Sequence, residues 1–378
     1  MRLLAQYIPQ SPRLVKRTIE TLTLTLFVSL SACEGRHEPP ASLEPLPATS
    51  RHREALVLHQ QAFVADLHND ILLAVLDEGH QLGDRHQDHD TDIPRLREGG
   101  IDAQVFAVWV SPSFLPDRAA NRARDLIAVF DEQLARNPHD LGLALRAGDI
   151  ARLNQQGKIA GILGIEGGHA IENKIENLRM FYDQGVRLVG ITWNNSTDWA
   201  DAAADATPSH DGLTEFGRQV IQEMNRLGML IDISHAAATT VEDILVVSTH
   251  PIVASHSDAA ALNPHFRNLT DDQIHAIARN GGVIGVNFFT AYLQANAREV
   301  PIDRLIDHID HIVELAGPDH VALGSDFDGV PWTPTGLEDV AGMPRVTEAL
   351  LQRGYSEEDI RKILGGNFLR VFRQVCGE

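Results

Sequence analysis

The sequence predicts an α/β fold, a closed (β/α)8 barrel of the TIM type. Short, almost continuous apolar runs, typical of strands covered on both faces, recur along the chain, and amphipathic stretches lie between them. This alternation is typical of βαβ units and a parallel sheet, and eight repeats are typical of a barrel. The expected strands are residues 63–67, 102–109, 159–165, 186–192, 229–234, 251–255, 283–288 and 321–325.

The segments between these runs are expected to be helices. The amphipathic stretches are 117–134, 214–227, 270–280 and 302–315. Thr270 and Gln273 have the spacing of a capping box, and Ser356 has the position of an N-cap before a final helix. His308 and His311 belong to a charge-rich helical stretch, and we expect both to face solvent.

The folded part is expected to be one barrel domain over residues 54–378. The chain has 378 residues, enough for one large domain or two ordinary ones. Its hydrophobic fraction of 43% and charged fraction of 22% are typical of a globular protein with a full core. No internal repeat or low-complexity segment interrupts it.

Residues 1–32 are expected to be a signal peptide of the lipoprotein type. Arg13, Lys16 and Arg17 precede an apolar segment over residues 21–32. That segment is shorter than the ~20 residues that a membrane-spanning helix needs. Leu30-Ser31-Ala32-Cys33 resembles the bacterial lipoprotein cleavage box, in which the cysteine is lipidated. The alternative is an ordinary secretory signal.

This leader predicts a place in the bacterial cell envelope. With Cys33 lipidated, the protein is held on the periplasmic side of a membrane, and the proline-rich residues 33–53 form a tether. With an ordinary signal, the protein is secreted. The only other cysteine is Cys376, so no internal disulfide is expected.

Composition and missing motifs exclude several classes of function. The formal net charge of -20 argues against a nucleic-acid partner, which requires a basic surface. The sequence has no phosphate-binding loop, dinucleotide-binding glycine motif or nucleophile elbow. Nucleotide-dependent and serine-dependent chemistry are therefore not indicated.

Residue types that bind metals stand where several of the apolar runs end. They are His68 and Asp70 after the first run, Glu166 after the third, His235 after the fifth, His256 after the sixth and Asp326 after the eighth. In a parallel barrel the chemistry gathers at the carboxyl ends of the strands. Imidazoles and carboxylates that converge there predict a hydrolytic metal centre.

Spacing supports the pairing of His68 with Asp70. Positions two apart on a strand point to the same side, so both side chains can reach one ion. His86 and Asp88 have the same spacing, but no apolar run precedes them. We expect these two residues on the surface, in a polar loop over residues 78–91 that forms a lid or rim.

The other candidates keep alternatives that the sequence leaves open. Glu166 alone is equally well explained by a buried ion pair, although a carboxylate, unlike an imidazole, can bridge two cations. Asp326 can be a ligand or a general base, and Asp328 competes with it. Arg267 can clamp a substrate carboxylate or brace its own loop. His169 is expected to be a core or loop histidine.

Several segments together resemble one known family. Residues 56–372 resemble the membrane (renal) dipeptidases, peptidase family M19, and their bacterial relatives among the amidohydrolase-like barrels. The segments that carry the resemblance are 66–70, 164–169, 185–187, 212–217, 225–232, 255–257 and 324–329.

The resemblance implies a binuclear zinc dipeptidase. His68 and Asp70 would bind the first Zn²⁺, His235 and His256 the second, and Glu166 would bridge the two ions. The family pattern also makes Asp326 the acid/base and Arg267 the residue that holds the terminal carboxylate of a small dipeptide. A D-residue at the carboxyl side is compatible with the family, and a homodimer is a family expectation.

The chain departs from the family pattern at Trp193. In the well-studied dipeptidases a histidine follows the threonine at the end of the fourth strand and helps to hold the substrate carbonyl. Trp193 follows Thr192 here, and an indole donates a hydrogen bond but cannot become cationic. The alternatives are hydrolysis of another amide, a lactam or an ester, a non-catalytic ligand-binding lipoprotein, and a mononuclear hydrolase such as a deaminase.

Overall fold

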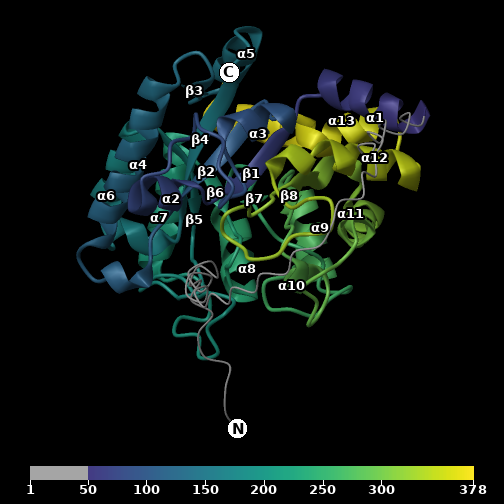
Figure 1. Cartoon of the computed structure of the whole chain (residues 1–378). Coiled ribbons are helices and arrows are strands. Elements are labelled where there is room, and N and C mark those ends of the chain that lie inside the picture. The colour runs from purple at the N-terminus through teal and green to yellow at the C-terminus, as the bar shows by residue number, and fades with distance from the viewer. Residues whose placement is uncertain (1–49) are drawn as a thin grey trace, which may run out of the picture. The chain divides into compact units, whose positions relative to one another are not determined.

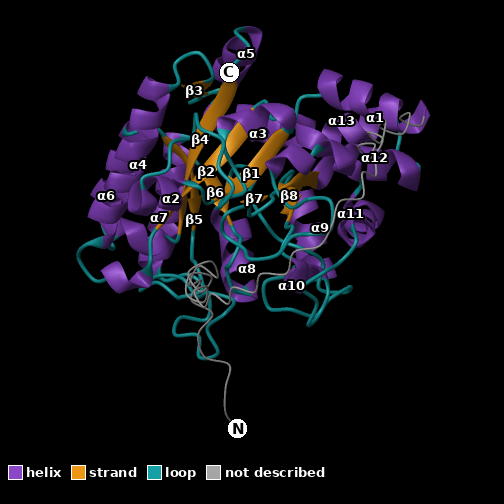
Figure 2. Ribbon diagram, in the orientation of Figure 1, coloured by secondary structure: helices purple, strands orange, loops and turns teal. Residues whose placement is uncertain are grey.

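A computed structural model describes residues 50–378, and the expected signal peptide and most of the tether lie outside the described residues. Within them, nine parallel strands form one sheet that closes on itself (Figures 1 and 2). The strands are β1 (Ala65–Asn69), β2 (Ala103–Trp109), β3 (Leu141–Leu143), β4 (Ile159–Glu166), β5 (Val186–Gly190), β6 (Leu230–Asp232), β7 (Val253–Ala254), β8 (Val283–Val286) and β9 (Val321–Leu323).

The sheet order confirms the barrel. The strands run β2-β1-β9-β8-β7-β6-β5-β4, and pairing of β4 with β2 closes the circle. The eight barrel strands are the eight that the apolar runs predict. Figure 2 shows these strands in the middle, with helices around them.

Strand β3 is an addition that the sequence pattern did not indicate. It pairs with Ile159–Gly161 of β4. From Leu163 onward, the same edge of β4 pairs with β5 instead. Because β4 is longer than β5, it leaves a stretch of edge free, and β3 covers that stretch outside the barrel. Its sequence, Leu-Gly-Leu, is too short for an apolar run to stand out.

Helices connect and cover the strands. They are α1 (Ser50–Gln61), α2 (Leu72–Glu78), α3 (Ile93–Glu98), α4 (Ala119–Arg136), α5 (Ala147–Gln155), α6 (Ile175–Asp183), α7 (Glu215–Leu227), α8 (Ala238–Val247), α9 (Asp271–Arg279), α10 (Thr290–Leu293), α11 (Ile302–Ala316), α12 (Pro344–Arg353), α13 (Glu357–Arg361) and α14 (Asn367–Cys376). Thr270 and Gln273 form the predicted capping box of α9, and Ser356 caps α13. No helix in residues 50–378 is both long and apolar enough to span a membrane.

Helix α14 closes one end of the barrel. Asn367 donates a hydrogen bond to the carbonyl of Val321, the first residue of β9, and Arg370 donates to the carbonyl of Gly281, just before β8. Phe368 and Phe372 pack among side chains from alternate strand positions. Because these contacts lie at the amino ends of the strands, the carboxyl ends remain for a functional site.

Two sequence expectations need correction. Helix α1 runs from Ser50 to Gln61, so residues 51–53 belong to the folded part rather than to the tether. His308 does not face solvent: it is 0% exposed, and its ring nitrogens contact Ala259 N at 3.1 Å and Leu293 O at 3.0 Å. The reason is helical spacing, since His308 lies on the same buried stripe of α11 as Leu305 and Ile312.

Candidate metal centre

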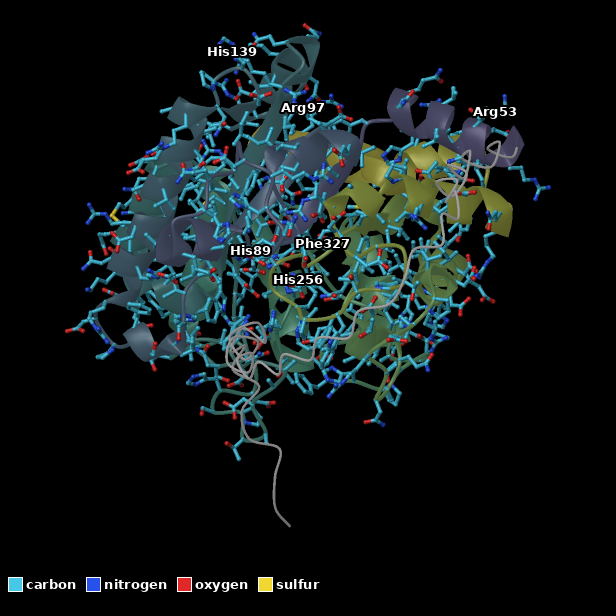
Figure 3. All side chains as sticks on the ribbon, in the orientation of Figure 1. Arg53, His89, Arg97, His139, His256 and Phe327 are labelled. Carbon is cyan, nitrogen blue, oxygen red and sulfur yellow. The ribbon has the colours of Figure 1, made fainter. Side chains whose placement is uncertain are left out.

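The six strand-end residues that sequence analysis selected gather in one place. All are between 1% and 8% exposed, and atoms of three overlapping groups of these residues lie within 4.8 Å of one another. The groups are His68–Asp70–Glu166, Glu166–His235–His256 and His68–His256–Asp326. His256 is labelled near the middle of the molecule in Figure 3.

Glu166, the last residue of β4, lies at the centre of this cluster. Its Oε2 is 3.4 Å from His68 Nε2. Its Oε1 is 2.9 Å from His235 Nε2 and 3.7 Å from His256 Nε2. One carboxylate oxygen therefore faces the β1 side of the cluster and the other faces the two histidines, which is the orientation of a bridging group.

The longer separations in this cluster are those expected between ligands of one metal ion. Ligands about 2.0–2.1 Å from a tetrahedral ion are about 3.3–3.4 Å from one another. His68 Nε2 is 3.4 Å from Asp70 Oδ2, and the Nε2 atoms of His235 and His256 are 3.1 Å apart. His68 Nε2 is buried without a hydrogen-bond partner among the described residues. This donor set fits divalent transition metals such as Zn²⁺.

The electrostatics of the cluster favour a bound cation. Burial lowers the pKa of His235 to about 4. Burial and the charge of His68 lower the pKa of His256 well below its usual range. Both imidazoles are therefore neutral and can each offer a lone pair to a metal ion. Burial also works to lower the pKa of His68, but Glu166 and Asp70 raise it well above the ordinary value. The two carboxylates thus create a site that attracts positive charge.

The two neutral histidines are held by hydrogen bonds from their other ring nitrogen. Asn194 Oδ1 lies 3.0 Å from His235 Nδ1, and Ser255 Oγ lies 2.7 Å from His256 Nδ1. Ser255 Oγ in turn donates to Asp232 Oδ2 at 2.6 Å. Such partners fix the orientation of a ligating ring, so each Nε2 points toward Glu166.

The same arrangement recurs on the opposite side of the site. Asp66 accepts hydrogen bonds from Ser325 N at 2.8 Å and from Ser325 Oγ at 2.7 Å. Ser325 precedes Asp326, whose backbone N–H donates to His68 O at 3.1 Å. On both sides of the site, a buried strand aspartate accepts hydrogen bonds from a serine, and the residue after that serine, His256 or Asp326, is thereby positioned.

The structure separates the two competing aspartates. Asp326 lies in one donor group with His68 and His256, and it accepts a hydrogen bond from Asn287 Nδ2 at 2.9 Å. Burial, reinforced by nearby carboxylates, raises the pKa of Asp326 to about 7. Asp328 instead accepts from Asp90 N at 2.8 Å and faces the loop after α2. Of the two aspartates, Asp326 is thus the one that lies at the cluster.

Arg267 lies beside the cluster and reaches a cavity. It is 3% exposed, its Nη2 donates to His256 O at 3.2 Å, and its guanidinium carbon lies 5.5 Å from the centre of the Tyr292 ring. Arg267 Nε is buried and has no hydrogen-bond partner in the described part of the chain. Arg267 and His235 line the same cavity of about 350 Å³.

Two tryptophans form a wall of the site. The ring of Trp193 lies 6.2 Å from that of His235 and 5.1 Å from that of Trp109. Trp109 ends β2 and pairs in register with Glu166. Sequence analysis missed Trp109, although it ends an apolar run as the other site residues do. His169, in the short 3-10 helix Gly168–Ile171, contacts Val110 O at 2.8 Å and is buried, which agrees with the expected core histidine.

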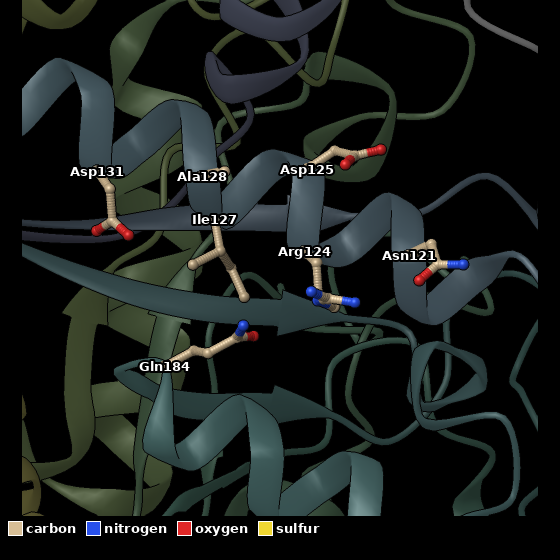
Figure 4. Close-up of a pocket in the computed structure, with 7 residues that line it drawn as sticks. All are labelled: Asn121, Arg124, Asp125, Ile127, Ala128, Asp131 and Gln184. Carbon is tan, nitrogen blue, oxygen red and sulfur yellow. The ribbon is translucent and has the colours of Figure 1, made fainter.

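A second hollow, of about 360 Å³, lies beside α4 and away from the cluster (Figure 4). None of its lining residues belongs to the donor groups. They are Asn121, Arg124, Asp125, Ile127, Ala128, Asp131 and Gln184. We assign the functional site to the cavity beside Arg267 because His235, one of the buried, convergent donors, lines it.

Comparison with known proteins agrees with the geometry. The model of the membrane dipeptidase family, peptidase family M19, matches residues 52–377. The chain belongs to this family. The protein is therefore a metallo-dipeptidase, an enzyme of metal-dependent dipeptide hydrolysis on an amidohydrolase-like barrel.

Solved structures of similar proteins include other members of family M19. A dipeptidase named AC has 29% identity and a TM-score of 0.78, over 84% of this chain and 99% of that one. The probable dipeptidase PvdM from Pseudomonas aeruginosa has 26% identity and a TM-score of 0.81, over 86% and 98%. A metallopeptidase from Rhodobacter sphaeroides, liganded with a phosphinate mimic of L-Ala-D-Ala, has 28% identity and a TM-score of 0.76, over 83% and 99%.

Proposed function

We propose that this dipeptidase uses two Zn²⁺ ions to cleave free-ended dipeptides, including those with a D-residue at the carboxyl side. The observation that carries the proposal is the position of Glu166, whose two oxygens face separate donor groups. The phosphinate mimic of L-Ala-D-Ala bound to the Rhodobacter sphaeroides relative supports the substrate class.

His68, Asp70 and Glu166 would hold one ion, and His235, His256 and Glu166 the other. When bound, two such ions polarise the scissile carbonyl and lower the pKa of a water molecule toward ~7. The protein supplies buried donors that are already oriented by their hydrogen-bond partners. Glu166 and Asp70 balance the added positive charge.

Asp326 is the proposed acid/base. Its carboxyl group lies in one donor group with His68 and His256, where it can accept a proton from the attacking water and return it to the leaving amine. Asn287 holds one of its oxygens at 2.9 Å, which leaves the other to exchange the proton. The backbone bond from Asp326 to His68 O keeps the carboxyl group beside the cluster.

Arg267 and Trp193 are the proposed substrate-binding residues. A guanidinium group that lines the cavity with unused donor capacity suits the terminal carboxylate of a dipeptide. The Trp193–Trp109 pair lies beside His235, where its rings can contact a substrate bound at the cluster. In this arrangement Arg267 contributes orientation rather than bond-breaking.

Zinc analysis combined with dipeptide turnover tests the proposal. We expect Glu166→Ala to hold two fewer zinc ions per chain than the wild type and to lose dipeptidase activity, since both ions lose a shared ligand. The exposed His139→Ala is the matched control and should change neither quantity. Full activity and unchanged zinc content in Glu166→Ala would reject the bridging role.

The same measurements distinguish the dipeptidase from the alternative functions that the sequence left open. If Glu166→Ala binds one ion fewer than the wild type, the centre is mononuclear. If the wild type binds no zinc, the protein is a ligand-binding module. Turnover of N-acyl amino acids, lactams or esters in preference to dipeptides would show that Trp193 marks a change of substrate.

We further propose that Cys33 carries a lipid anchor that holds the enzyme on the periplasmic side of the bacterial cell envelope. Support comes from the sequence around Cys33, which lies outside the described residues. Cys33→Ser should move the enzyme from the membrane fraction to the soluble one and abolish labelling by palmitate, whereas Cys376→Ser should do neither. A homodimer remains a prediction that light scattering tests.

A further inference from the structure

A second group of possible metal donors lies in the loop between α2 and α3. Glu78, His80 and His89 have donor atoms within 4.8 Å of one another. His80 Nε2 is 3.5 Å and His89 Nε2 is 3.3 Å from the same oxygen, Glu78 Oε2. None of these residues belongs to the centre around Glu166, and the sequence pattern did not single them out.

The distances are those of ligands around an ion. A good hydrogen bond between an imidazole N–H and a carboxylate is about 2.7–2.9 Å long, so the contacts of His80 and His89 with Glu78, like that of His89 with Asp328, are weak hydrogen bonds at most. They match the separation of about 3.3 Å between ligands in a tetrahedral zinc site. The ring of His80 packs against that of His89 at 4.2 Å, which keeps both Nε2 atoms on the same side as Glu78.

The other nitrogen of His89 has the partner that a ligating histidine normally has. His89 Nδ1 lies 3.3 Å from Asp328 Oδ1, and Asp328 also accepts from the backbone N–H of Asp90. A carboxylate on the far nitrogen orients the ring and raises the basicity of the ligating nitrogen. Figure 3 labels His89 close to Phe327, the residue before Asp328.

We propose that Glu78, His80 and His89 form a third, exchangeable site for a divalent transition metal such as Zn²⁺. The site has three protein ligands and a fourth position open to water. The Glu78 side chain is 55% exposed, so the ion exchanges with solvent more readily than the ions of the buried centre. The site is separate from the proposed dipeptidase reaction and does not depend on it.

An ion at this site would fasten the loop of residues 79–92 to the edge of the active site. The ion would join Glu78, at the end of α2, to His89. His89 in turn contacts Asp328, in the segment that carries Asp326. The next residue, Gly329, is packed so closely that an added methyl group would meet the carboxylates of Asp70 and Asp326. Binding of the third ion therefore reduces the mobility of the loop and of the segment around Asp326.

The loop itself contains a matched control. His86 is close to His80, with ring centres 4.3 Å apart, but its Nε2 faces the carbonyl of Gln81 at 2.9 Å. It is therefore a histidine of the same loop that is not a proposed ligand. His139, exposed and well away from His89 in Figure 3, is a second control.

Equilibrium dialysis of tag-free protein against Zn²⁺ tests the site. We expect the wild type, His86→Ala and His139→Ala to bind three ions per chain, and His80→Ala and His89→Ala to bind two, or the third at least tenfold more weakly. In Glu166→Ala one ion should remain, and adding His89→Ala should remove it. This pair of results distinguishes failure of the third site from failure of the proposed binuclear centre.

Hydrogen exchange gives a readout that does not depend on stoichiometry. Zn²⁺ beyond the first two equivalents should slow exchange of residues 79–92 at least severalfold in the wild type and in His86→Ala, but not in His89→Ala. Equal zinc content in the wild type and His89→Ala, or equal protection of the loop in both, would overturn the proposal.

Discussion

Asp326 and Asp328 are two residues apart, yet their surroundings differ completely. Both have a positive φ, 63° and 65°, which non-glycine residues seldom adopt. This conformation turns the chain sharply after β9, so that Asp326 enters the donor cluster while Asp328 turns to His89. His235, with φ 69°, reaches Glu166 from the end of β6 through a similar turn. Unusual backbone conformations thus occur where side chains must leave the strand direction.

At the residue scale, Asp326→Asn should lower kcat by about 10²–10⁴-fold, since an amide neither accepts nor returns the proton. Zinc content should stay at the wild-type value, because the amide keeps the shape of the carboxylate. Steady-state kinetics and metal analysis on the same preparation check this. A variant with normal kcat would assign proton transfer to another group.

At the scale of elements, the centre depends on which residues lie just beyond each strand. Strands β6 and β7 are three and two residues long, yet they place His235 and His256 on adjacent strands of the barrel. Asp232, the last residue of β6, joins them by accepting hydrogen bonds from Ser255 N at 2.9 Å and Ser234 N at 3.0 Å. Asp232, a polar residue at the end of one strand, therefore aligns the ends of β6 and β7.

Loss of this link should weaken metal binding without removing a ligand. We expect Asp232→Asn to reduce zinc affinity about 10–100-fold, as is typical when the partner that orients a ligand is lost. Competition with a chelator of known affinity measures the change. Asp131→Asn, in the hollow beside α4, is the control and should leave affinity unaltered. Equal affinities in the two variants would mean that Asp232 does not orient His256.

At the scale of the whole molecule, one end of the barrel is covered by a helix and the other end carries the donor cluster. Helix α14 covers the amino ends of the strands, so water and substrate approach from the carboxyl ends. The outer helices contribute buried polar groups of their own. His308 on α11 accepts from Ala259 N–H and donates to Leu293 O, and the bond from Ala259 requires the neutral ring.

His308 should make stability depend on pH. Burial lowers its pKa to about 4 in the folded protein, so the unfolded chain, with a pKa near 6.5, binds the proton more tightly. Stability is therefore complete above pH ~6.5 and is lost as pH falls toward 4, by at most roughly 3.5 kcal/mol at ~1.4 kcal/mol per pKa unit. Urea unfolding of the wild type and His308→Gln should show a smaller pH slope in the variant. Identical slopes would contradict this assignment.

Local pattern by itself determined most of the architecture. Apolar runs mark strands because a strand covered on both faces must be apolar throughout, and all eight barrel strands were predicted. The same runs locate His68, Glu166 and His256, since a residue at or just past the carboxyl end of a strand in a parallel barrel lies at its functional edge. Segment-by-segment resemblance added the family, which the comparison confirmed.

Only the tertiary structure decided what those residues touch. It separated Asp326 from Asp328, buried His308, set Trp109 beside Glu166 and joined Asp232 to Ser255. It also brought Glu78 to His89 across a loop with no regular pattern. The reason is that such contacts depend on strand register and on the paths of loops between residues far apart in the sequence. Periodicity along the chain records which way a side chain faces, but not which side chain it meets.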